Sequence, residues 1–478
     1  MKFKFLIGLI LIILLVFPTV LSKQETTNFV SDSLIVKLNS KMNLNEIKNL
    51  DPNIINVDYL FGDSKSLDNR AKNLEMDTFY IVKLKENSNI TKIAEKLSKN
   101  SKVESVEFDY FDELTMTPND QYFFSGGGFF GQWNLYNYGQ QIFPGVFGIS
   151  GVDVDARKAW DIETGNPDVL IAVLDTGVNY NHADLRNKIS DIRYDFVDED
   201  NDPMDQNGHG TSISGMAGAQ TNNNIGIASL CPECTIVPVR VCTSSCLSSN
   251  VIQGIYFAVD NDVDVISMSF GGYDSDCSRT NGYDIAIQYA YENGVTLVAG
   301  AGNDYSSSSF YPACRPEVIS VAGHGASGQI NQSNYGNWVD VAAPNVLILT
   351  TVLSGGYGLG GGTSIAAPQV SALIGLLISS HGDITPDKAK EFVMLTSEEL
   401  DWDETPINSG RINAYNALSA CFIDNEIILN QVCVDDGPKM CFEQELISNC
   451  QECGCPTGKY CMSNGECSKY KVAVPFYL

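Results

Sequence analysis

The stretch VLIAVLDTGVN, residues 169–179, indicates the fold of the longest part of this chain. Six apolar residues run without a break and end at Asp175, where Thr176 and Gly177 begin a turn. An uninterrupted apolar strand is typical of a parallel sheet that is covered on both faces. Similar runs follow, with helix-like segments between them: CTIVPVRV, VDVISMSF, GVTLVAG and VISVAG. We therefore predict an α/β fold with a mostly parallel sheet covered by helices.

The N-terminal residues have the pattern of a secretory signal peptide. Lys2 and Lys4 precede an apolar run that extends from Phe5 to Phe17. We predict a signal peptide over 1–22 and a secreted, extracellular protein. A signal-anchored form is the alternative, because the apolar run is long for a signal. No later segment approaches the roughly 20 apolar residues that span a bilayer, so we expect no stable membrane span in the mature form.

Charge and cysteine content narrow the class of protein further. Residues 116–478 contain 15 basic and 42 acidic side chains, a net charge of −27, which argues against binding to nucleic acid. Cysteine is absent from 1–230, occurs six times in 231–314 and eight times in 421–467. Even numbers of cysteines in a secreted chain predict disulfides.

The six central cysteines suggest short loops closed by disulfides. We expect the pairs Cys231–Cys234 and Cys242–Cys246, which leaves Cys277–Cys314. A structural zinc at the sequence CPEC, residues 231–234, is the alternative, because pairs of thiolates also bind zinc. The eight C-terminal cysteines allow 105 pairings, so the sequence does not assign them.

The remaining segments predict a chain of several domains. Residues 23–115 contain strand-like runs and one helical pattern, which predicts a small α+β unit. The stretch TMTPNDQYFFSGGGFFGQWNL that follows is rich in turn residues, which predicts an exposed linker. Residues 421–478 form a cysteine-rich module, which is too poor in core residues to fold without disulfides.

Three side chains at expected strand ends and helix starts have the types needed for nucleophilic catalysis. Asp175 ends a strand, His209 lies between glycines in NGHGTSISGMAG, and Ser364 lies in GGGTSIAAPQV. A serine hydroxyl becomes a good nucleophile when a base takes its proton and a carboxylate holds that base. Asn303 in LVAGAGND could donate its amide to a developing oxyanion. Taken singly, each residue could equally be a helix cap or a turn residue.

The four stretches LDTGVN, GHGTS, GAGN and GTSIAAP together resemble the signature motifs of subtilisin-like serine proteases, in particular those similar to thermitase. The resemblance covers about 116–420. It implies a three-layer subtilisin-like fold in which Asp175 orients the base, His209 is the general base, Ser364 is the nucleophile and Asn303 is the oxyanion donor. The implied activity is a serine endopeptidase that forms an acyl-enzyme.

The same resemblance implies how the other segments act. Residues 23–115 would be an inhibitory propeptide that the enzyme removes itself near 114–118, followed by a catalytic domain over 116–420. Proteins or peptides would be the substrates, the propeptide would be the inhibitor, and the mature form would be a monomer. The residues implied to line the substrate cleft are Ser269, Phe270, Gly271, Ala301 and Gly302.

The pocket for the substrate side chain is expected to be shallow. Phe310 stands where family members often have a small residue, which favours small or medium substrate side chains. Asp304 at the rim could instead favour basic side chains.

Calcium is the cofactor that the resemblance implies, at two structural sites. Many oxygen ligands close together suit this hard cation. The first site would lie in YDFVDEDNDPMD, although a solvated acidic loop is the alternative; its expected ligands are Asp195, Asp198, Asp200 and Asp202, with Glu199 and Asp205 less certain. The second would lie in TNNNIGIA and use side chains or carbonyls of Asp120, Asp184, Gln220, Asn223, Ile225 and Ile227.

Two rival functions stay open at this point. One is a selective processing protease, and the other is an inactive subtilase fold that acts as a binding protein. The complete set of catalytic motifs favours the enzyme, because a binding protein has no need of them.

Overall fold

A computed structural model describes most of the chain, which divides into two compact units, residues 1–114 and 115–478. The expected signal peptide and most of the cysteine-rich module lie outside the described residues. The described residues are 29–40, 43–61, 76–85, 88–110, 116–124, 130–277, 281–382, 384–399, 405–423, 426–430, 439–442, 444–448, 460–461 and 467–468.

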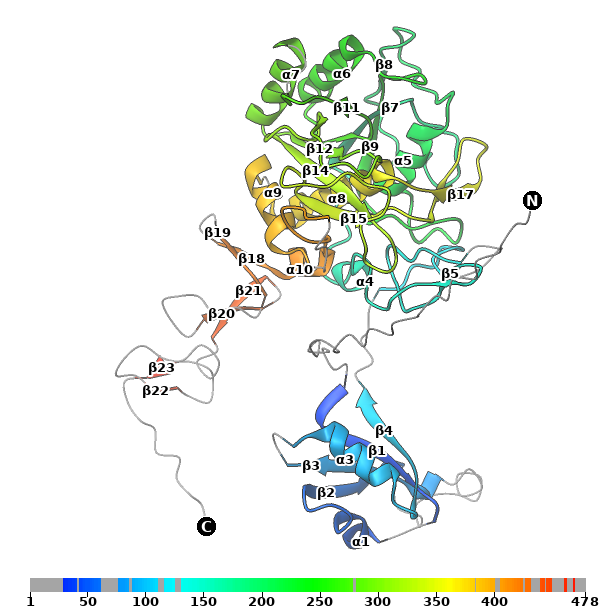
Figure 1. Cartoon of the computed structure of the whole chain (residues 1–478), viewed down its shortest axis with the longest axis vertical. Helices are drawn as coiled ribbons and strands as arrows, with labels where there is room; N and C mark the ends of the chain where they lie inside the picture. The colour runs from blue at the N-terminus through cyan, green and yellow to red at the C-terminus, as the bar shows by residue number, and fades with distance from the viewer. Residues whose placement is uncertain are drawn as a thin grey trace, which may run out of the picture. The chain divides into compact units, whose positions relative to one another are not determined.

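The first unit is a four-stranded antiparallel sheet with helices (Figure 1). Its strand order is β2-β3-β1-β4, and alternate residues of β1 such as Leu34, Val36 and Leu38 are buried against Ile93 and Leu97 of α3. The predicted strands and helix are confirmed. The elements are β1 (Phe29–Leu38), α1 (Leu44–Lys48), β2 (Ile54–Tyr59), η1 (Met76–Thr78), β3 (Phe79–Leu84), α3 (Ile90–Ser98) and β4 (Val103–Tyr110).

The second unit is built on a seven-stranded sheet in which every neighbouring pair is parallel. The order β15-β14-β12-β10-β7-β9-β8 places β7, which ends at Asp175, near the middle. The five predicted apolar runs all form strands of this sheet. The strands are β7 (Leu170–Asp175), β8 (Tyr194–Asp195), β9 (Thr235–Arg240), β10 (Val265–Met268), β12 (Thr296–Gly300), β14 (Val318–His324) and β15 (Val341–Pro344).

Helices cover both faces of this sheet, which gives the three predicted layers (Figure 1). Ile171 and Val173 of β7 pack on the side of α5 and α8, whereas Ala172 and Leu174 pack on the side of α6 and α7. This alternation is the period of a strand that is buried on both faces. The helices are α4 (Ala156–Ala159), α5 (His209–Gly218), α6 (Ser248–Asp260), α7 (Asn281–Glu292), α8 (Thr363–His381), α9 (Pro386–Leu395) and α10 (Ala414–Ser419).

Helix α8 runs through the core of the second unit. Among the described residues it alone has the length and hydropathy of a membrane span, yet 78% of that apolar window is buried inside the protein. Its apolar character therefore reflects the core of the fold.

Short two-stranded pairs complete the second unit. They are β5 (Gln141–Phe143) with β6 (Val146–Phe147), β11 (Gly272–Tyr273) with β13 (Phe310–Tyr311), β16 (Ile348–Thr351) with β17 (Tyr357–Gly360), β18 (Cys421–Ile423) with β19 (Glu426–Ile428), β20 (Lys439–Phe442) with β21 (Glu445–Ser448), and β22 (Tyr460–Cys461) with β23 (Cys467–Ser468).

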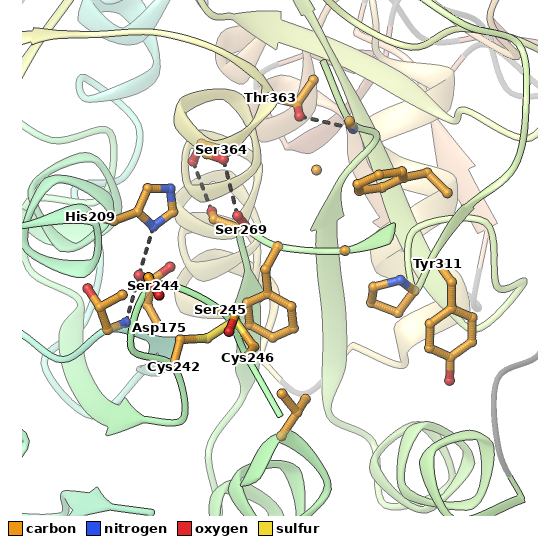
Figure 2. A pocket seen from close by; sticks show the side chains of 18 of the residues that line it. Asp175, His209, Cys242, Ser244, Ser245, Cys246, Ser269, Tyr311, Thr363 and Ser364 are labelled. Carbon is orange, nitrogen blue, oxygen red and sulfur yellow. Dashed lines mark hydrogen bonds and ion pairs between the residues drawn. A yellow bond between two sulfur atoms is a disulfide. The ribbon is translucent and has the colours of Figure 1, made fainter. Parts of the chain in front are cut away.

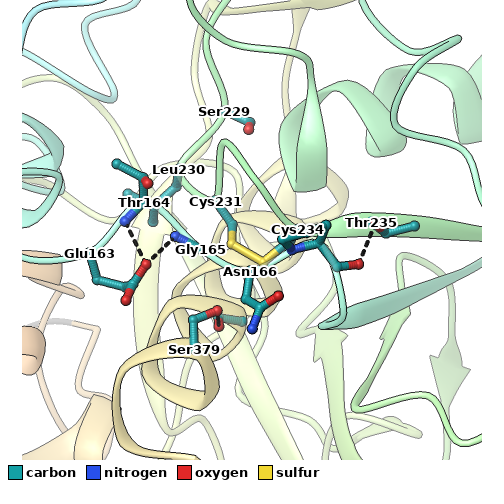
Figure 3. The surroundings of a disulfide bond; sticks show 12 residues. Glu163, Thr164, Gly165, Asn166, Ser229, Leu230, Cys231, Cys234, Thr235 and Ser379 are labelled. Atoms are coloured by element: carbon teal, nitrogen blue, oxygen red, sulfur yellow. Dashed lines mark hydrogen bonds between the residues drawn. A yellow bond between two sulfur atoms is a disulfide. The ribbon is translucent and has the colours of Figure 1, made fainter.

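The three disulfides expected in the central part of the chain are all present, Cys231–Cys234, Cys242–Cys246 and Cys277–Cys314. A fourth joins Cys421 to Cys441. Figure 3 shows the Cys231–Cys234 bond deep beside Gly165 and Asn166. Because this bond uses both sulfurs of CPEC, the zinc alternative at these two residues is wrong.

Over the described residues of this stretch, 116–124 and 130–135, the expectation of an exposed linker is also wrong. Phe123, Trp133 and Leu135 are at most 2% exposed and belong to the main core. The Trp133 indole donates to the carbonyl of Val346 at 2.9 Å. Turn residues fill the stretch, but its few large apolar side chains have enough surface to hold it against the sheet domain.

Candidate active site

The carboxyl ends of β7, β10 and β12 and the first residues of α5 and α8 surround a cleft of ≈ 530 Å³ (Figure 2). Ligands bind at this edge in open α/β sheets because the loops and helix N-termini gather there. The four expected catalytic side chains line this cleft: Asp175, His209, Asn303 and Ser364.

Asp175 and His209 form a short hydrogen bond. His209 Nδ1 lies 2.7 Å from Asp175 Oδ1, and the side chain of Asp175 is 2% exposed while that of His209 is 40% exposed. Burial lowers the pKa of His209, but the hydrogen bond and the charge of Asp175 outweigh it, so the pKa lies above the usual 6.5. The imidazole therefore presents one fixed nitrogen to Asp175 and the other to the cleft.

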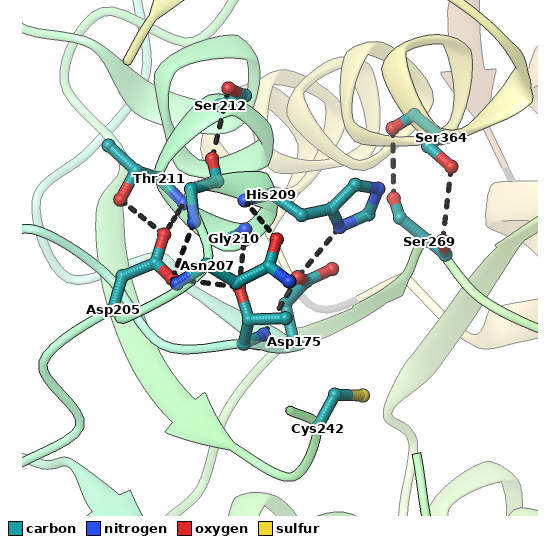
Figure 4. A network of polar contacts seen from close by, with 12 residues as sticks. Asp175, Asp205, Asn207, His209, Gly210, Thr211, Ser212, Cys242, Ser269 and Ser364 are labelled. Carbon is teal, nitrogen blue, oxygen red and sulfur yellow. Dashed lines mark hydrogen bonds and ion pairs between the residues drawn. The ribbon is translucent and has the colours of Figure 1, made fainter. Parts of the chain in front are cut away.

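Asp205 holds the turn that places His209 at the start of α5 (Figure 4). Its Oδ1 accepts hydrogen bonds from the Thr176 hydroxyl and from the backbone N–H groups of Asn207 and Gly208, at 2.8–2.9 Å. Its Oδ2 accepts from the N–H and the hydroxyl of Thr211 at 2.9 and 2.6 Å. Five protein donors thus surround this carboxylate and give Asp205 a structural role in the turn.

Close packing brings α5 onto the turn after Asp175. A Cβ atom on Gly210 would lie 2.1 Å from the carbonyl oxygen of Gly177. The glycine after His209 is therefore required for the two segments to touch.

Ser364 is the second residue of α8, and Gly362 is the cap residue. The Ser364 hydroxyl donates to the carbonyl of Ser269 at 3.1 Å, and the Ser269 hydroxyl donates to the carbonyl of Ser364 at 2.9 Å. Ser364 therefore does not cap the helix. Figure 4 shows the imidazole of His209 between Asp175 and Ser364.

Asn303 is held by its amide oxygen. Its Oδ1 accepts from the backbone N–H of Thr363 at 2.7 Å, and the Thr363 hydroxyl in turn accepts from the N–H of Gly302 at 3.1 Å (Figure 2). These bonds leave the amide Nδ2 as the end of Asn303 that is available to a ligand in the cleft.

The expected substrate residues are brought together with one exception. Ser269, Phe270, Gly271 and Gly302 line the cleft, but Ala301 is fully buried among Ala322, Ile330, Val339 and Ala342. Gly300 and Gly302 thus line the cleft, while the side chain of Ala301 lies in the core.

The ring of Phe310 lies close to both Gly271 and Gly302, which line the cleft. A Cβ atom on Gly271 would lie 2.4 Å from Phe310 Cε1, and one on Gly302 would lie 3.0 Å from Phe310 Cδ2. Asp304, which was expected at the rim, accepts a hydrogen bond from the Tyr273 hydroxyl at 2.9 Å.

Two of the expected calcium ligands are buried carboxylates. Asp120 and Asp184 are 5% and 0% exposed, and burial raises the pKa of both, that of Asp120 to about 6. Asp120 accepts from the N–H groups of Asn222 and Asn223, while Asp184 accepts from the Asn223 amide and the Ile227 N–H. The charge of Asp184 also raises the pKa of Asp120. These donors are neutral and include no cationic partner, and a divalent cation would supply that charge.

The remaining expected ligands of that site lie in the same loop. The side-chain oxygens of Gln220 and Asn223 accept from Asn187 Nδ2 and from the Ile225 N–H, both at 2.9 Å. Within the described ranges, no cluster of three or more His, Cys, Asp or Glu side chains is arranged to hold a metal. A cation here would therefore depend on carbonyl and amide oxygens as well.

The acidic loop at the other expected calcium site is paired with a positively charged side chain, that of Arg240. The buried Arg240 donates through Nη1 to Asp195 at 2.6 Å and to Asp198 at 2.5 Å. Asp202 accepts from the Tyr180 hydroxyl at 2.5 Å, and Asp200 accepts from the N–H of Asp202. One guanidinium thus supplies part of the positive charge that these carboxylates need, and a calcium ion at this loop stays a prediction.

Several residues of the site were not found from the sequence. The ion pairs of Arg240 join residues that are distant in sequence. The hydrogen bonds that Asp205 accepts depend on the shape of a turn, which the sequence pattern does not show. The Cys242–Cys246 bond was expected, but not its position in the wall of the cleft.

Comparisons with known proteins agree with this geometry. A sequence model of the subtilase family matches residues 166–417, more than half of the chain. The chain is 37% identical over 338 residues to the thermophilic serine proteinase of Bacillus sp. (strain AK1), covering 69% of this chain and 76% of that protein. It is 36% identical over 305 residues to thermitase from Thermoactinomyces vulgaris, covering 63% and 99%.

The fold matches solved structures as well. A protease from Pseudoalteromonas arctica PAMC 21717 aligns with a TM-score of 0.55 and 31% identity, over 63% of this chain and 98% of that one. The parallel sheet, the cleft at its carboxyl edge and these relatives lead to one conclusion. The chain belongs to the subtilase family and is a subtilisin-like serine endopeptidase.

Proposed function

We propose that the protein is a secreted serine endopeptidase in which Asp175, His209 and Ser364 form the catalytic triad. The observation that carries this proposal is the 2.7 Å bond between Asp175 and His209 in a cleft that Ser364 also lines. The carboxylate holds the imidazole in the tautomer whose free nitrogen can take a proton from a hydroxyl.

The reaction begins when the Ser364 hydroxyl leaves the carbonyl of Ser269 and turns to His209. The serine hydroxyl turns about a single side-chain bond, and such rotations take picoseconds to nanoseconds in accessible side chains. His209 takes the proton while Ser364 Oγ attacks the carbonyl carbon of the substrate. His209 then gives the proton to the leaving amine, and water hydrolyses the acyl-enzyme.

The negative charge on the substrate oxygen needs donors that are already in place. Asn303 Nδ2 is the first donor we propose, because Thr363 fixes the opposite end of its amide. The N-terminal end of α8, where Ser364 lies, adds the positive end of a helix dipole. Removing one such donor costs about 10²–10³ in kcat.

Selectivity for the side chain next to the cleaved bond follows from Phe310. Its ring lies against Gly271 and Gly302, so little depth is left between these walls. Small or medium side chains should therefore be preferred. Asp304 accepts a hydrogen bond from the Tyr273 hydroxyl but its carboxylate is exposed, so a preference for basic side chains is the alternative.

The other segments complete the proposal. Residues 1–22 would direct secretion, 23–115 would act as an inhibitory propeptide removed by the enzyme itself, 116–420 would be the catalytic domain, and 421–478 a disulfide-rich module. A relative named extracellular protease, from Xanthomonas campestris, supports secretion.

One calcium ion would be bound at the loop after α5. Its ligands would be Asp120, Asp184, Asn223 and the carbonyls of Gln220, Ile225 and Ile227. The ion would supply positive charge to two carboxylates that are otherwise costly to bury in ionised form. It would thereby hold the N-terminal stretch around Asp120 against the loop.

One experiment tests the proposed function. The full-length chain and its Ser364→Ala variant are purified, and release of the propeptide and hydrolysis of casein are followed. We expect the wild-type protein to release the propeptide and degrade casein, and the variant to do neither. Equal processing of the two pure proteins would refute self-cleavage by Ser364.

A further inference from the structure

Residues 301–309, the Asn303 loop, join β12 to β13 without a strand or helix of their own. The backbone of such a loop is held only by the partners that its N–H and C=O groups find elsewhere in the fold. The bond from the Thr363 N–H fixes the amide oxygen of Asn303, but it does not fix the backbone on either side of that residue. The position of Asn303 therefore depends on what holds the loop.

A single side chain, that of Asn334, holds this loop on both sides of Asn303. Before Asn303, the Asn334 amide Nδ2 donates to the carbonyl of Ala301 at 2.9 Å. After Asn303, Asn334 Oδ1 accepts from the backbone N–H groups of Asp304 and Ser306, both at 3.1 Å. One planar amide thus joins backbone groups that lie on either side of the proposed oxyanion donor.

Asn334 is itself fixed against the loop and against the main sheet. It is 0% exposed, its backbone N–H donates to the carbonyl of Gly302 at 2.8 Å, and a Cβ atom on Gly302 would lie 2.5 Å from Asn334 Nδ2. Its carbonyl accepts from the Ser333 hydroxyl at 2.9 Å, and that hydroxyl accepts from the N–H of Gly323 in β14 at 2.9 Å. The loop is thereby linked to a strand of the parallel sheet.

The chemistry of these contacts calls for an amide side chain at Asn334. Two N–H donors face its oxygen and one carbonyl faces its nitrogen, so neither an apolar side chain nor a carboxylate would satisfy all three partners. Buried backbone groups that lose their partners are costly, so the loop would shift without this amide. Asn334 does not line the cleft, and any effect on the reaction would therefore pass through the loop.

We propose that Asn334 is a positioning residue for the oxyanion donor, which holds the loop on both sides of Asn303 so that Asn303 Nδ2 points to the place where negative charge develops. This inference rests on the proposed function and deepens it. An oxyanion donor acts because it is in place before the reaction, and a misplacement of about 1 Å can cost about 10²-fold in rate. Because the donor acts on the transition state, loss of Asn334 should lower kcat and spare KM.

The test is a double-mutant cycle on the hydrolysis of a peptide anilide, with wild type, Asn334→Ala, Asn303→Ala and Asn303→Ala/Asn334→Ala. Asn334→Ala should lower kcat about 10- to 100-fold and change KM less than about twofold. Asn303→Ala should itself lose about 10²–10³ in kcat, and adding Asn334→Ala should then cost less than about threefold, because the donor that Asn334 positions is gone. A merely structural loss of folded enzyme would instead lower kcat by the same factor in both backgrounds.

Asn137→Ala is the matched control. Asn137 is also a buried asparagine outside the cleft, whose amide donates to the carbonyls of Val152 and Ala326 and accepts from the N–H of Gly139. Its loss removes amide bonds of the same kind at a site that does not hold the Asn303 loop. We expect it to lower the melting temperature and to keep the wild-type kcat.

The outcomes distinguish this inference from the proposed function. A wild-type enzyme that cleaves no peptide would sink the proposed function, and full kcat in Asn303→Ala would remove the oxyanion role on which the inference rests. Equal falls of kcat in the two backgrounds, or wild-type kcat in Asn334→Ala, would overturn the role of Asn334 alone.

A second variant decides if Asn334→Ala does not fold. Asn334→Asp keeps an acceptor for the two N–H groups and loses only the donor to Ala301. We expect its kcat to fall about tenfold in the wild-type background and less than about threefold in Asn303→Ala. An equal fall in both backgrounds, or no fall in either, overturns the inference.

Discussion

Replacing Phe310 by alanine should widen the substrate pocket and reverse its preference. The ring lies so close to Gly271 and Gly302 that Cβ atoms there would come within 2.4 and 3.0 Å of it. Removing it frees about the volume of one phenyl ring. A substrate phenylalanine that fills this space should gain about 1.5–3 kcal/mol, the usual value for burying such a side chain. The ratio of kcat/KM for Phe over Ala substrates should therefore rise about 10- to 150-fold.

The assay uses peptide anilides that differ only in the residue before the cleaved bond, alanine or phenylalanine. Phe310→Leu is the matched control, because it keeps an apolar side chain of intermediate volume and should give an intermediate ratio. Hydrolysis of a short alanine ester and the melting temperature report whether Phe310→Ala still folds. If that variant is folded and active on the ester but its Phe-to-Ala ratio equals that of wild type, Phe310 does not set the depth of the pocket.

Three further predictions follow from the site. Wild-type kcat/KM should rise with pH through an inflection above 6.5, because Asp175 raises the pKa of His209. In Asp175→Asn the imidazole stays buried but loses the neighbouring charge, so the inflection should move to lower pH and kcat should fall about 10⁴-fold. Wild-type and variant pH profiles that coincide would contradict this. Removing calcium should lower the unfolding free energy by about 2.7 kcal/mol from its value at a hundredfold excess over Kd, and calorimetry of Asp184→Asn should show no response to calcium. Peroxide should leave activity largely intact, because the buried residue after Ser364 is Ile365, which has no thioether; rapid loss of activity with all disulfides unchanged would disprove this.

The sequence was sufficient for the fold and for the location of the site because both depend on local patterns. Unbroken apolar runs gave the strands of the parallel sheet, and the rule that function gathers at strand ends led to Asp175. His209 and Ser364 stand at the starts of helices, where glycines on both sides of His209 and just before Thr363 and Ser364 mark the turns. Each of these signals lies within about ten residues of the residue it identifies.

The errors concern contacts between distant segments. Arg240 binds Asp195 and Asp198 from 45 and 42 residues away, a partner that the acidic loop alone does not reveal. Trp133 is held by a carbonyl 213 residues later, which no local count of turn residues reveals. Such pairings depend on how the strands are ordered in the sheet, and a single sequence does not fix that order.

The direction of the Ala301 side chain could not be predicted from the local sequence either. Gly300 and Gly302 face the cleft, so a shift of one residue decides whether a side chain meets the substrate or the core. Motif similarity identified the segment correctly but not the direction of each side chain within it.

The buried disulfide between Cys231 and Cys234 has a consequence for how the protein can be produced. Both cysteines are 0% exposed, and a Cβ atom on Gly375 of α8 would lie 2.7 Å from Cys234 Sγ. Once α8 has packed, no oxidant of ordinary size can reach these sulfurs, so oxidation has to come before the helix closes over them. Recombinant expression in a reducing cytosol would trap two thiols beneath the helix that carries Ser364. An oxidising compartment, or refolding in a glutathione buffer, is therefore the route to active material.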